Sequence, residues 1–206
     1  MLSKENIPPI EDILRDLEHP NPHINRVAFV NMKEYWPKES VAILIRNLDS
    51  KNVELRRKSV KGLGFFGKNI VNQIIQTYFS TKDGILKVSC LKVLVIIASN
   101  GPLDDFKGEI KVLIESAIKE ESAEVILTII SFLRQNGEES LPYLKALCRD
   151  ENVLKAKAAI TAISEINEIS VDSFLKSIVK DISLDALVRE SASQSLDLSD
   201  LEFSRF

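Results

Sequence analysis

One short helical pattern recurs along the chain and limits its fold more than any other feature of the sequence. The clearest copy is residues 49–67, DSKNVELRRKSVKGLGFFG, which reads as a turn, a helix and a glycine stop. The small or apolar residues of this copy, spaced as one face of a helix, are Leu55, Ser59, Val60 and Leu63. The pattern therefore predicts a helix that is buried along that face.

The same spacing (i, i+4, i+5, i+8) returns in five further places. The copies are Ile24, Ala28, Phe29 and Met32; Leu86, Cys90, Leu91 and Leu94; Val125, Ile129, Ile130 and Leu133; Leu154, Ala158, Ala159 and Ala162; and Val188, Ala192, Ser193 and Leu196. Their first positions are separated by 31, 31, 39, 29 and 34 residues. A helical unit that repeats at this period is typical of a solenoid, in which neighbouring units bury each other's apolar faces.

We therefore predict an all-α helical-repeat solenoid, an α-α superhelix of about five helix pairs with a capping helix at each end. A single domain over residues 1–206 is expected. Its parts are a cap helix at 7–18, pairs near 22–48, 52–79, 83–118, 122–149 and 151–181, a second cap at 185–197 and a tail at 198–206. Residues 99–108, SNGPLDDFKG, are an insertion in the third pair, and this segment is either a binding loop or a tolerated surface loop.

Composition excludes several classes of protein. No run approaches the roughly 18 apolar residues of a membrane span, and acidic residues near the N-terminus argue against a signal peptide. Two cysteines, Cys90 and Cys148, are too few for a disulfide framework, which favours a reducing compartment and buried structural thiols over reactive ones. The net charge of −3 argues against a nucleic-acid partner.

Motifs that suggest chemistry are few. Residues 62–67 spell GxGxxG, but a helix rather than a strand precedes them, so Gly67 is interpreted as a helix C-cap and not as part of a phosphate-binding loop. His19 and His23 are the only histidines, and they lack the carboxylate or thiol companions of a metal site. The sequence therefore offers no catalytic set.

The second repeat is locally basic. Residues 51–68 contain six cations (Lys51, Arg56, Arg57, Lys58, Lys61 and Lys68) against the single anion Glu54. Two interpretations remain open: the cations bind an anionic ligand or a polar partner, or, as in the other repeats, they pair with carboxylates in the turns (Asp49, Asp83, Asp150 and Asp185). Aromatic residues including Tyr35 and Trp36 line a ligand groove or belong to the core.

Two segments resemble known repeats. LRRKSVKGLG and VRESASQSL resemble HEAT-like repeats, and together with HPNPHINRVAF they resemble the phycobilin lyase family with HEAT-like repeats, above all a small member associated with phycoerythrin. The resemblance covers nearly the whole chain, and it is strongest at 19–67 and 186–196. These motifs specify a fold better than an activity.

The resemblance implies a role in attaching linear tetrapyrroles to cysteines of phycobiliproteins through thioether bonds. It implies a chaperone-like accessory protein for phycoerythrin maturation, whose partners are a phycoerythrin subunit and a second HEAT-repeat bilin lyase. A phycobilin lyase acting directly and a generic interaction scaffold are the alternatives, so catalysis by this chain stays open.

The same resemblance implies a transient phycobilin such as phycoerythrobilin and no permanent cofactor, and the residues themselves predict no metal site. Arg56, Arg57 and Lys61 would then meet the bilin propionates, and Tyr35 and Trp36 its rings. The implied location is the cyanobacterial cytosol or the plastid stroma.

Overall fold

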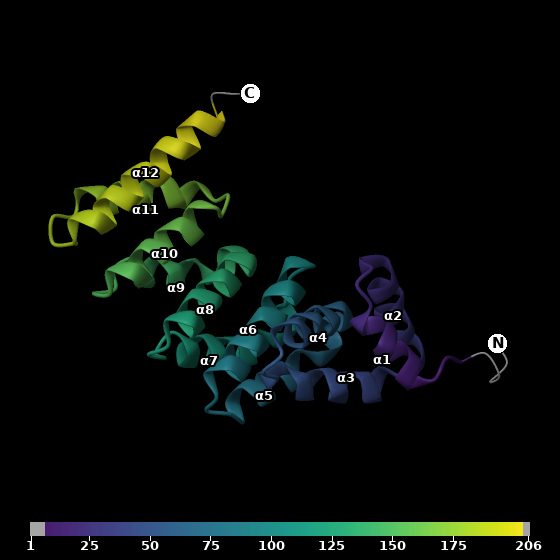
Figure 1. Ribbon diagram of the computed structural model, residues 1–206. Coiled ribbons are helices and arrows are strands. Elements are labelled where there is room, and N and C mark those ends of the chain that lie inside the picture. Colours follow the sequence, from purple (N-terminus) through teal and green to yellow (C-terminus); the bar gives the residue numbers. More distant parts are fainter. Residues whose placement is uncertain (1–6, 204–206) are drawn as a thin grey trace. The chain divides into compact units, whose positions relative to one another are not determined.

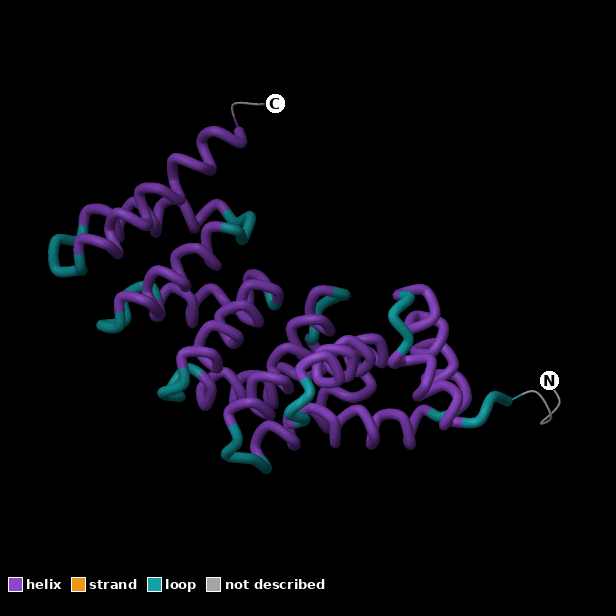
Figure 2. The backbone as a smooth tube through the Cα atoms, in the orientation of Figure 1, coloured by secondary structure: helices purple, strands orange, loops and turns teal. Residues whose placement is uncertain are grey.

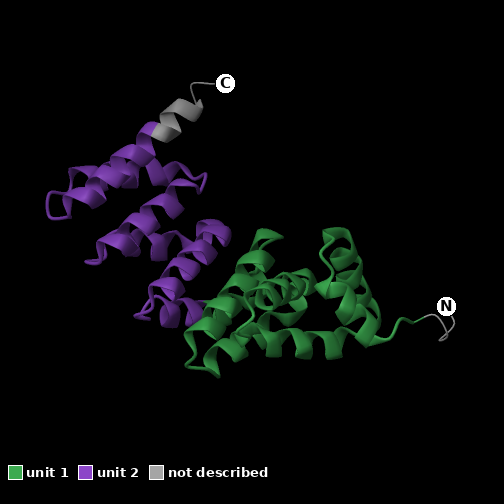
Figure 3. Ribbon diagram, viewed as in Figure 1, with its two compact units in different colours: residues 1–110 green, residues 111–206 purple. Residues whose placement is uncertain are grey.

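The computed structural model describes residues 7–203 and, of these, the side chains of residues 7–197. Helices joined by short turns make up the regular structure of this range, in which no strand occurs (Figure 2). The predicted all-α helical-repeat fold is confirmed. The chain divides into two compact units, residues 1–110 and 111–206, and the division falls within one helix (Figure 3).

Figure 1 labels the helices in chain order. In the first unit they are α1 (Ile10–Glu18), α2 (Pro22–Tyr35), α3 (Pro37–Arg46), α4 (Val53–Phe66), α5 (Val71–Phe79) and α6 (Gly84–Ser99). Helix α7 (Lys107–Ala117) contains the division. In the second unit they are α8 (Ala123–Gln135), α9 (Leu141–Leu147), α10 (Val153–Ser164), α11 (Ile169–Lys180) and α12 (Ala186–Phe203).

Both ends of the chain contain helix at the predicted caps. α12 continues to Phe203, past residue 198, where the sequence predicts a tail, and residues 204–206 lie outside the described part. None of the described helices has the length and apolar character needed to cross a bilayer.

A polar N-cap begins the first helix of each repeat. Asn52, for example, accepts hydrogen bonds through Oδ1 from the backbone amides of Glu54 (3.0 Å) and Leu55 (3.2 Å). Such a cap satisfies amides that have no partner within the helix. The equivalent acceptors are Asn21, Asp83, Ser122, Asn152 and Asp185. These caps mark the start of each repeat.

The caps also fix which residue is buried deepest. The residue seven positions after each cap is fully buried in all six repeats: Ala28, Ser59, Cys90, Ile129, Ala159 and Ala192 each have 0% exposure. Four positions further on stand Met32, Leu63, Leu94, Leu133 and Ile163, also at 0%. A face this closely covered by its neighbours is what a helical solenoid requires.

Counting from the caps corrects the predicted register of the fifth repeat. Leu154, predicted as its leading apolar residue, is 74% exposed. The cap is Asn152, so the buried face is one residue later than predicted, at Ala159, Ile160 and Ile163. Leu154 is an apolar residue in the first turn of α10, so periodicity alone places the start of the buried face there.

In the first unit, side chains of one repeat bond to carbonyl groups of another. Lys58 donates from Nζ to the carbonyl of Glu18 at the end of α1 (2.9 Å), and Ser89 donates from Oγ to the carbonyl of Leu48 (2.8 Å). The last carbonyls of a helix lack partners within it and carry partial negative charge, which suits a cation or a hydroxyl donor.

The second unit contains ion pairs between repeats instead. Arg134 pairs with Glu165, and Arg149 pairs with Asp181. The turn carboxylates predicted to pair with helix cations bond mainly to backbone: Asp83 caps α6, and Asp185 accepts from the amide of Leu187 (2.8 Å).

The inserted segment 99–108 contains one buried side chain, that of Leu103. Leu103 is 3% exposed, and a short 3-10 turn, Asp104–Phe106, follows it. Its neighbours Pro102, Asp104 and Asp105 are exposed. The insertion is therefore an anchored surface loop.

The register predicts two opposite outcomes for Leu→Ala substitutions. Leu63→Ala leaves a cavity in a fully buried position and should lower the free energy of unfolding by about 2–5 kcal/mol. Leu154→Ala, at an exposed position, should change it by less than about 0.5 kcal/mol. Urea unfolding followed by circular dichroism measures both, and equal losses would contradict the register.

The Arg149–Asp181 pair predicts a dependence on acid. A hydrogen bond from the Ser183 hydroxyl lowers the pKa of Asp181 below its ordinary value, and a hydrogen bond from Arg149 is the next largest cause. A carboxylate whose pKa is lower in the folded than in the unfolded state stabilises the fold fully at pH values above the unfolded-state pKa of about 4. This stabilisation is lost as the pH falls through the pKa of the folded state. Asp181→Asn should therefore lower the melting temperature at pH 7, and by less at pH 3.

Melting curves of Asp181→Asn, Arg149→Gln and the double variant at both pH values make this test a double-mutant cycle. A coupling between the two residues that is the same at pH 7 and pH 3 would show that the charge of Asp181 is not its source.

Candidate functional site

A groove lies between α4 and α6 in the first unit, with a volume of about 600 Å³. The lining residues are Val53, Arg56, Arg57, Val60 and Lys61 from α4 and Ser89, Lys92 and Ile96 from α6. The structure thus brings the predicted residues Arg56, Arg57 and Lys61 together in one groove. Lys92, which the sequence did not single out, adds a cation from the neighbouring repeat.

The four cations of the groove differ in how far they are already engaged. Arg56 donates from Nη1 to the carbonyl of Ser50, so it fastens the turn before its own helix. Arg57 pairs with Glu54 at 3.1 Å, but both side chains are at least 70% exposed, and such pairs contribute little. Lys61 and Lys92 are exposed and have no ion pair or hydrogen bond among the described residues. They are the free positive charges of the groove.

The middle of the groove is apolar. Val60 and Ile96 are half-buried, and Val53 remains 45% exposed. The one uncharged polar residue that lines the groove, Ser89, has its Oγ 2.8 Å from the carbonyl oxygens of both Leu48 and Ile85, so its single hydroxyl hydrogen is already engaged. The groove therefore offers an apolar strip with positive charge beside it.

Glycine allows α4 and α6 to approach at the end of the groove. A Cβ on Gly64 would lie 2.4 Å from Cγ2 of Ile96, and one on Gly62 would lie 2.7 Å from Cε1 of Phe29. Gly67 ends α4 with a φ of 70°, which confirms its interpretation as a C-cap. The GxGxxG motif thus serves helix packing and helix termination. The sequence interpretation identified only its last glycine.

The structure does not place Tyr35 and Trp36 in this groove. Trp36 lies at the junction of α2 and α3 and donates from Nε1 to the carbonyl of Pro8 (3.0 Å), which ties it to the segment before α1. Tyr35 is half-buried at the end of α2. Their aromatic character alone does not reveal this placement.

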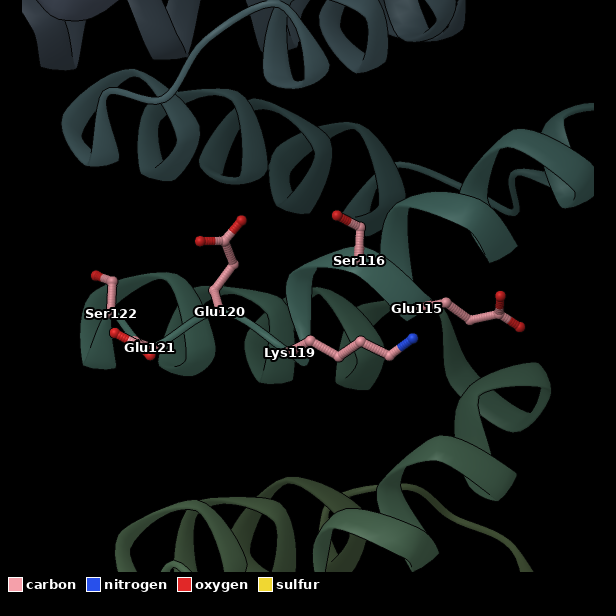
Figure 4. A pocket seen from close by; sticks show the side chains of 6 residues that line it. All are labelled: Glu115, Ser116, Lys119, Glu120, Glu121 and Ser122. Atoms are coloured by element: carbon pink, nitrogen blue, oxygen red, sulfur yellow. The ribbon is translucent and has the colours of Figure 1, made fainter.

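An acidic depression of about 660 Å³ lies in the second unit, at the end of α7 and the turn into α8. Its lining residues are Glu115, Ser116, Lys119, Glu120, Glu121 and Ser122. Figure 4 shows that the three carboxylates point in different directions. Among the described residues, no group of three or more His, Cys, Asp or Glu side chains is placed to hold a metal ion.

The two cysteines are buried and unpaired. Burial raises the pKa of Cys90 and of Cys148 to about 12. A thiol with such a pKa carries almost no thiolate at neutral pH, and the thiolate is the nucleophile. Both therefore match the predicted structural thiols. His19 has a local role as well, because its Nδ1 accepts from the amide of Asn21 (3.0 Å).

Comparison with known proteins confirms the resemblance indicated by the repeat motifs. The chain is 26% identical over 175 residues to the bilin biosynthesis protein CpeZ of Synechococcus sp. strain WH8020, which covers 82% of this chain and 94% of that protein. It is 23% identical over 188 residues to an uncharacterized phycocyanin operon protein Z of Pseudanabaena tenuis strain PCC 7409, covering 91% and 93%. No family model matches the chain.

Two of the solved structures similar to this chain are an engineered protein and a designed armadillo repeat protein. An engineered protein has 16% identity and a TM-score of 0.48, with 91% of this chain and 95% of that chain covered. A designed armadillo repeat protein has 13% identity and a TM-score of 0.44, with 92% and 99% covered.

The close approach of α4 and α6 predicts an unusual response to alanine. Gly→Ala within a helix normally stabilises it, but Gly64→Ala places a Cβ against Ile96 and should lower the free energy of unfolding by about 1–3 kcal/mol. Gly84→Ala in the first turn of α6 meets nothing within 4 Å and should be neutral or slightly stabilising. Urea unfolding of both variants tests this prediction, which fails if Gly64→Ala is as stable as Gly84→Ala.

Proposed function

We propose that the chain is an accessory protein of phycobiliprotein maturation. It binds a phycoerythrin subunit, a partner HEAT-repeat bilin lyase or both while a phycobilin is joined to a cysteine of the subunit through a thioether bond. It acts in the manner of a chaperone, holding the subunit in a form that accepts the chromophore. Its place of action is the cyanobacterial cytosol or the plastid stroma.

The observation that carries this proposal is the similarity to CpeZ, which extends over 94% of that protein. A match of this extent relates nearly the whole of this chain to CpeZ, and not one repeat alone. Repeat arrays serve widely as binding scaffolds. The groove between α4 and α6 adds a surface suited to such a role. It combines an apolar strip with the ammonium groups of Lys61 and Lys92, which have no partner among the residues that the structure describes.

Contact with the phycobilin itself is an alternative use of the groove, separate from the binding of a protein partner. A transient phycobilin such as phycoerythrobilin would meet Arg56, Arg57 and Lys61 through its two propionates, since cations favour carboxylates. Its rings would lie on Val60 and Ile96, which line the groove, whereas Tyr35 and Trp36 would need a bilin that extends beyond it. No permanently bound cofactor is proposed.

Co-expression tests the proposed function. A phycoerythrin subunit is produced with its partner lyase and phycoerythrobilin, with and without this chain, and soluble and bilin-loaded subunit are measured. We expect both to rise several-fold when the chain is present. A covalent bilin on the subunit without the partner lyase would make the chain a phycobilin lyase in its own right.

The same experiment includes a matched control. Substitution of the buried Leu63 by Asp should unfold the array and abolish the rise, whereas Leu154→Asp at an exposed position should keep it. If the folded chain does not raise the amount of bilin-loaded subunit and pulls down no phycobiliprotein, the chain is a scaffold unrelated to bilins.

A further inference from the structure

The groove between α4 and α6 has the features of a surface that binds a helix. Lys61 lies nine residues after the cap Asn52, and Lys92 lies nine residues after the cap Asp83. Equivalent positions of two packed helices face the same way. Lys61 and Lys92 therefore occupy equivalent positions, one on each of the helices that form the groove.

The general spacing of packed helices suits the docking of a third helix on α4 and α6. Packed helices have axes about 8–10 Å apart, and a helix with its side chains is about 10–12 Å across. A helix lying along the α4–α6 groove would therefore have Lys61 near one flank and Lys92 near the other. Its own apolar face would rest on Val60 and Ile96.

The openness of the groove favours a protein segment over a small molecule. Sites for small molecules bury most of the ligand, about 70–90% of its surface. Here Lys61 and Lys92 are exposed, and Val53 at one end of the apolar strip is 45% exposed. An amphipathic helix needs only one face covered, which an open groove provides.

The charges indicate what kind of helix fits. The chain as a whole has a net charge of −3, yet residues 51–68 contain six cations and one anion. Lys61 and Lys92 have no carboxylate partner within the described part of the chain. Carboxylates on both sides of an apolar stripe would complement these charges, and such complementarity selects a partner and speeds its association.

We propose that the α4–α6 groove docks an acidic amphipathic helix of the phycoerythrin subunit, with an Asp or Glu on each side of the apolar stripe of that helix. The identity of the partner rests on the proposed function, whereas the charge and shape of the helix are argued from the groove. Lys61 and Lys92 each pair with one carboxylate, and Val60 and Ile96 receive the apolar stripe.

Charge reversal at the groove tests the proposal directly. The affinity of the full chain for the purified apo-subunit is measured by titration at low and at physiological salt. Lys61→Glu with Lys92→Glu should weaken binding by about tenfold or more and reduce its dependence on salt. Lys51→Glu with Lys68→Glu makes the same change of charge at exposed lysines of the second repeat that do not line the groove, and should retain affinity.

Circular dichroism and melting temperature should be the same for both pairs of variants, because all four lysines are exposed. Equal loss of affinity in the two pairs, or no loss in either, would overturn the assignment of the groove. The maturation activity measured by co-expression would then still stand, so the two proposals fail separately.

Cross-linking identifies the occupant. A carbodiimide joins an amine to a carboxylate that is in contact with it, with loss of water, and mass spectrometry locates the product. Lys61 and Lys92 should be joined to Asp or Glu residues of one helical segment of the subunit. A phycobilin joined at these lysines in a mixture that includes the bilin, or a peptide from a second copy of this chain, would overturn the proposal in favour of that occupant.

Discussion

The repeat array depends on the side chain seven residues after each N-cap. In all six repeats this residue is fully buried, and it is small in five of them: Ala28, Ser59, Cys90, Ala159 and Ala192, against Ile129 in the fourth. A small residue lets the neighbouring helix come close, and close packing supplies the apolar burial that no repeat achieves alone. The cap fixes where the helix starts, so it also fixes which residue is buried.

The groove between α4 and α6 follows from the same packing. Gly64 allows Ile96 to approach α4 at one end. Towards the starts of the two helices, the larger side chains of Val53 and Arg57 line the open part of the groove. Lys61 and Lys92, each nine residues after the cap of its own helix, lie beside this opening. The site is therefore formed by the contact between two repeats, and neither repeat has it alone.

Much of the fold, but only three of the eight residues that line the candidate groove, could be predicted from the sequence. Helical periodicity identified the repeats, because burial of one face leaves a direct pattern in the residues. It placed the fifth repeat one residue early, since Leu154 is apolar although it faces solvent, and the cap Asn152 was the better marker. Arg56, Arg57 and Lys61 were found because they share one helix. Lys92 and Ile96 were missed because they come from the next helix, although counting from the caps aligns Lys92 with Lys61.

The fixed distance from cap to buried residue determines where this chain tolerates a change of length. The insertion 99–108 follows the last buried turn of α6 and is anchored by Leu103, so it alters no cap and no core position. An added residue between Asn52 and Ser59 would instead rotate the whole buried face of α4 towards solvent. Natural variation in length, and any engineered loop, is therefore expected in the turns after the buried segments. Such a protein can acquire new surface contacts in evolution without rebuilding its core.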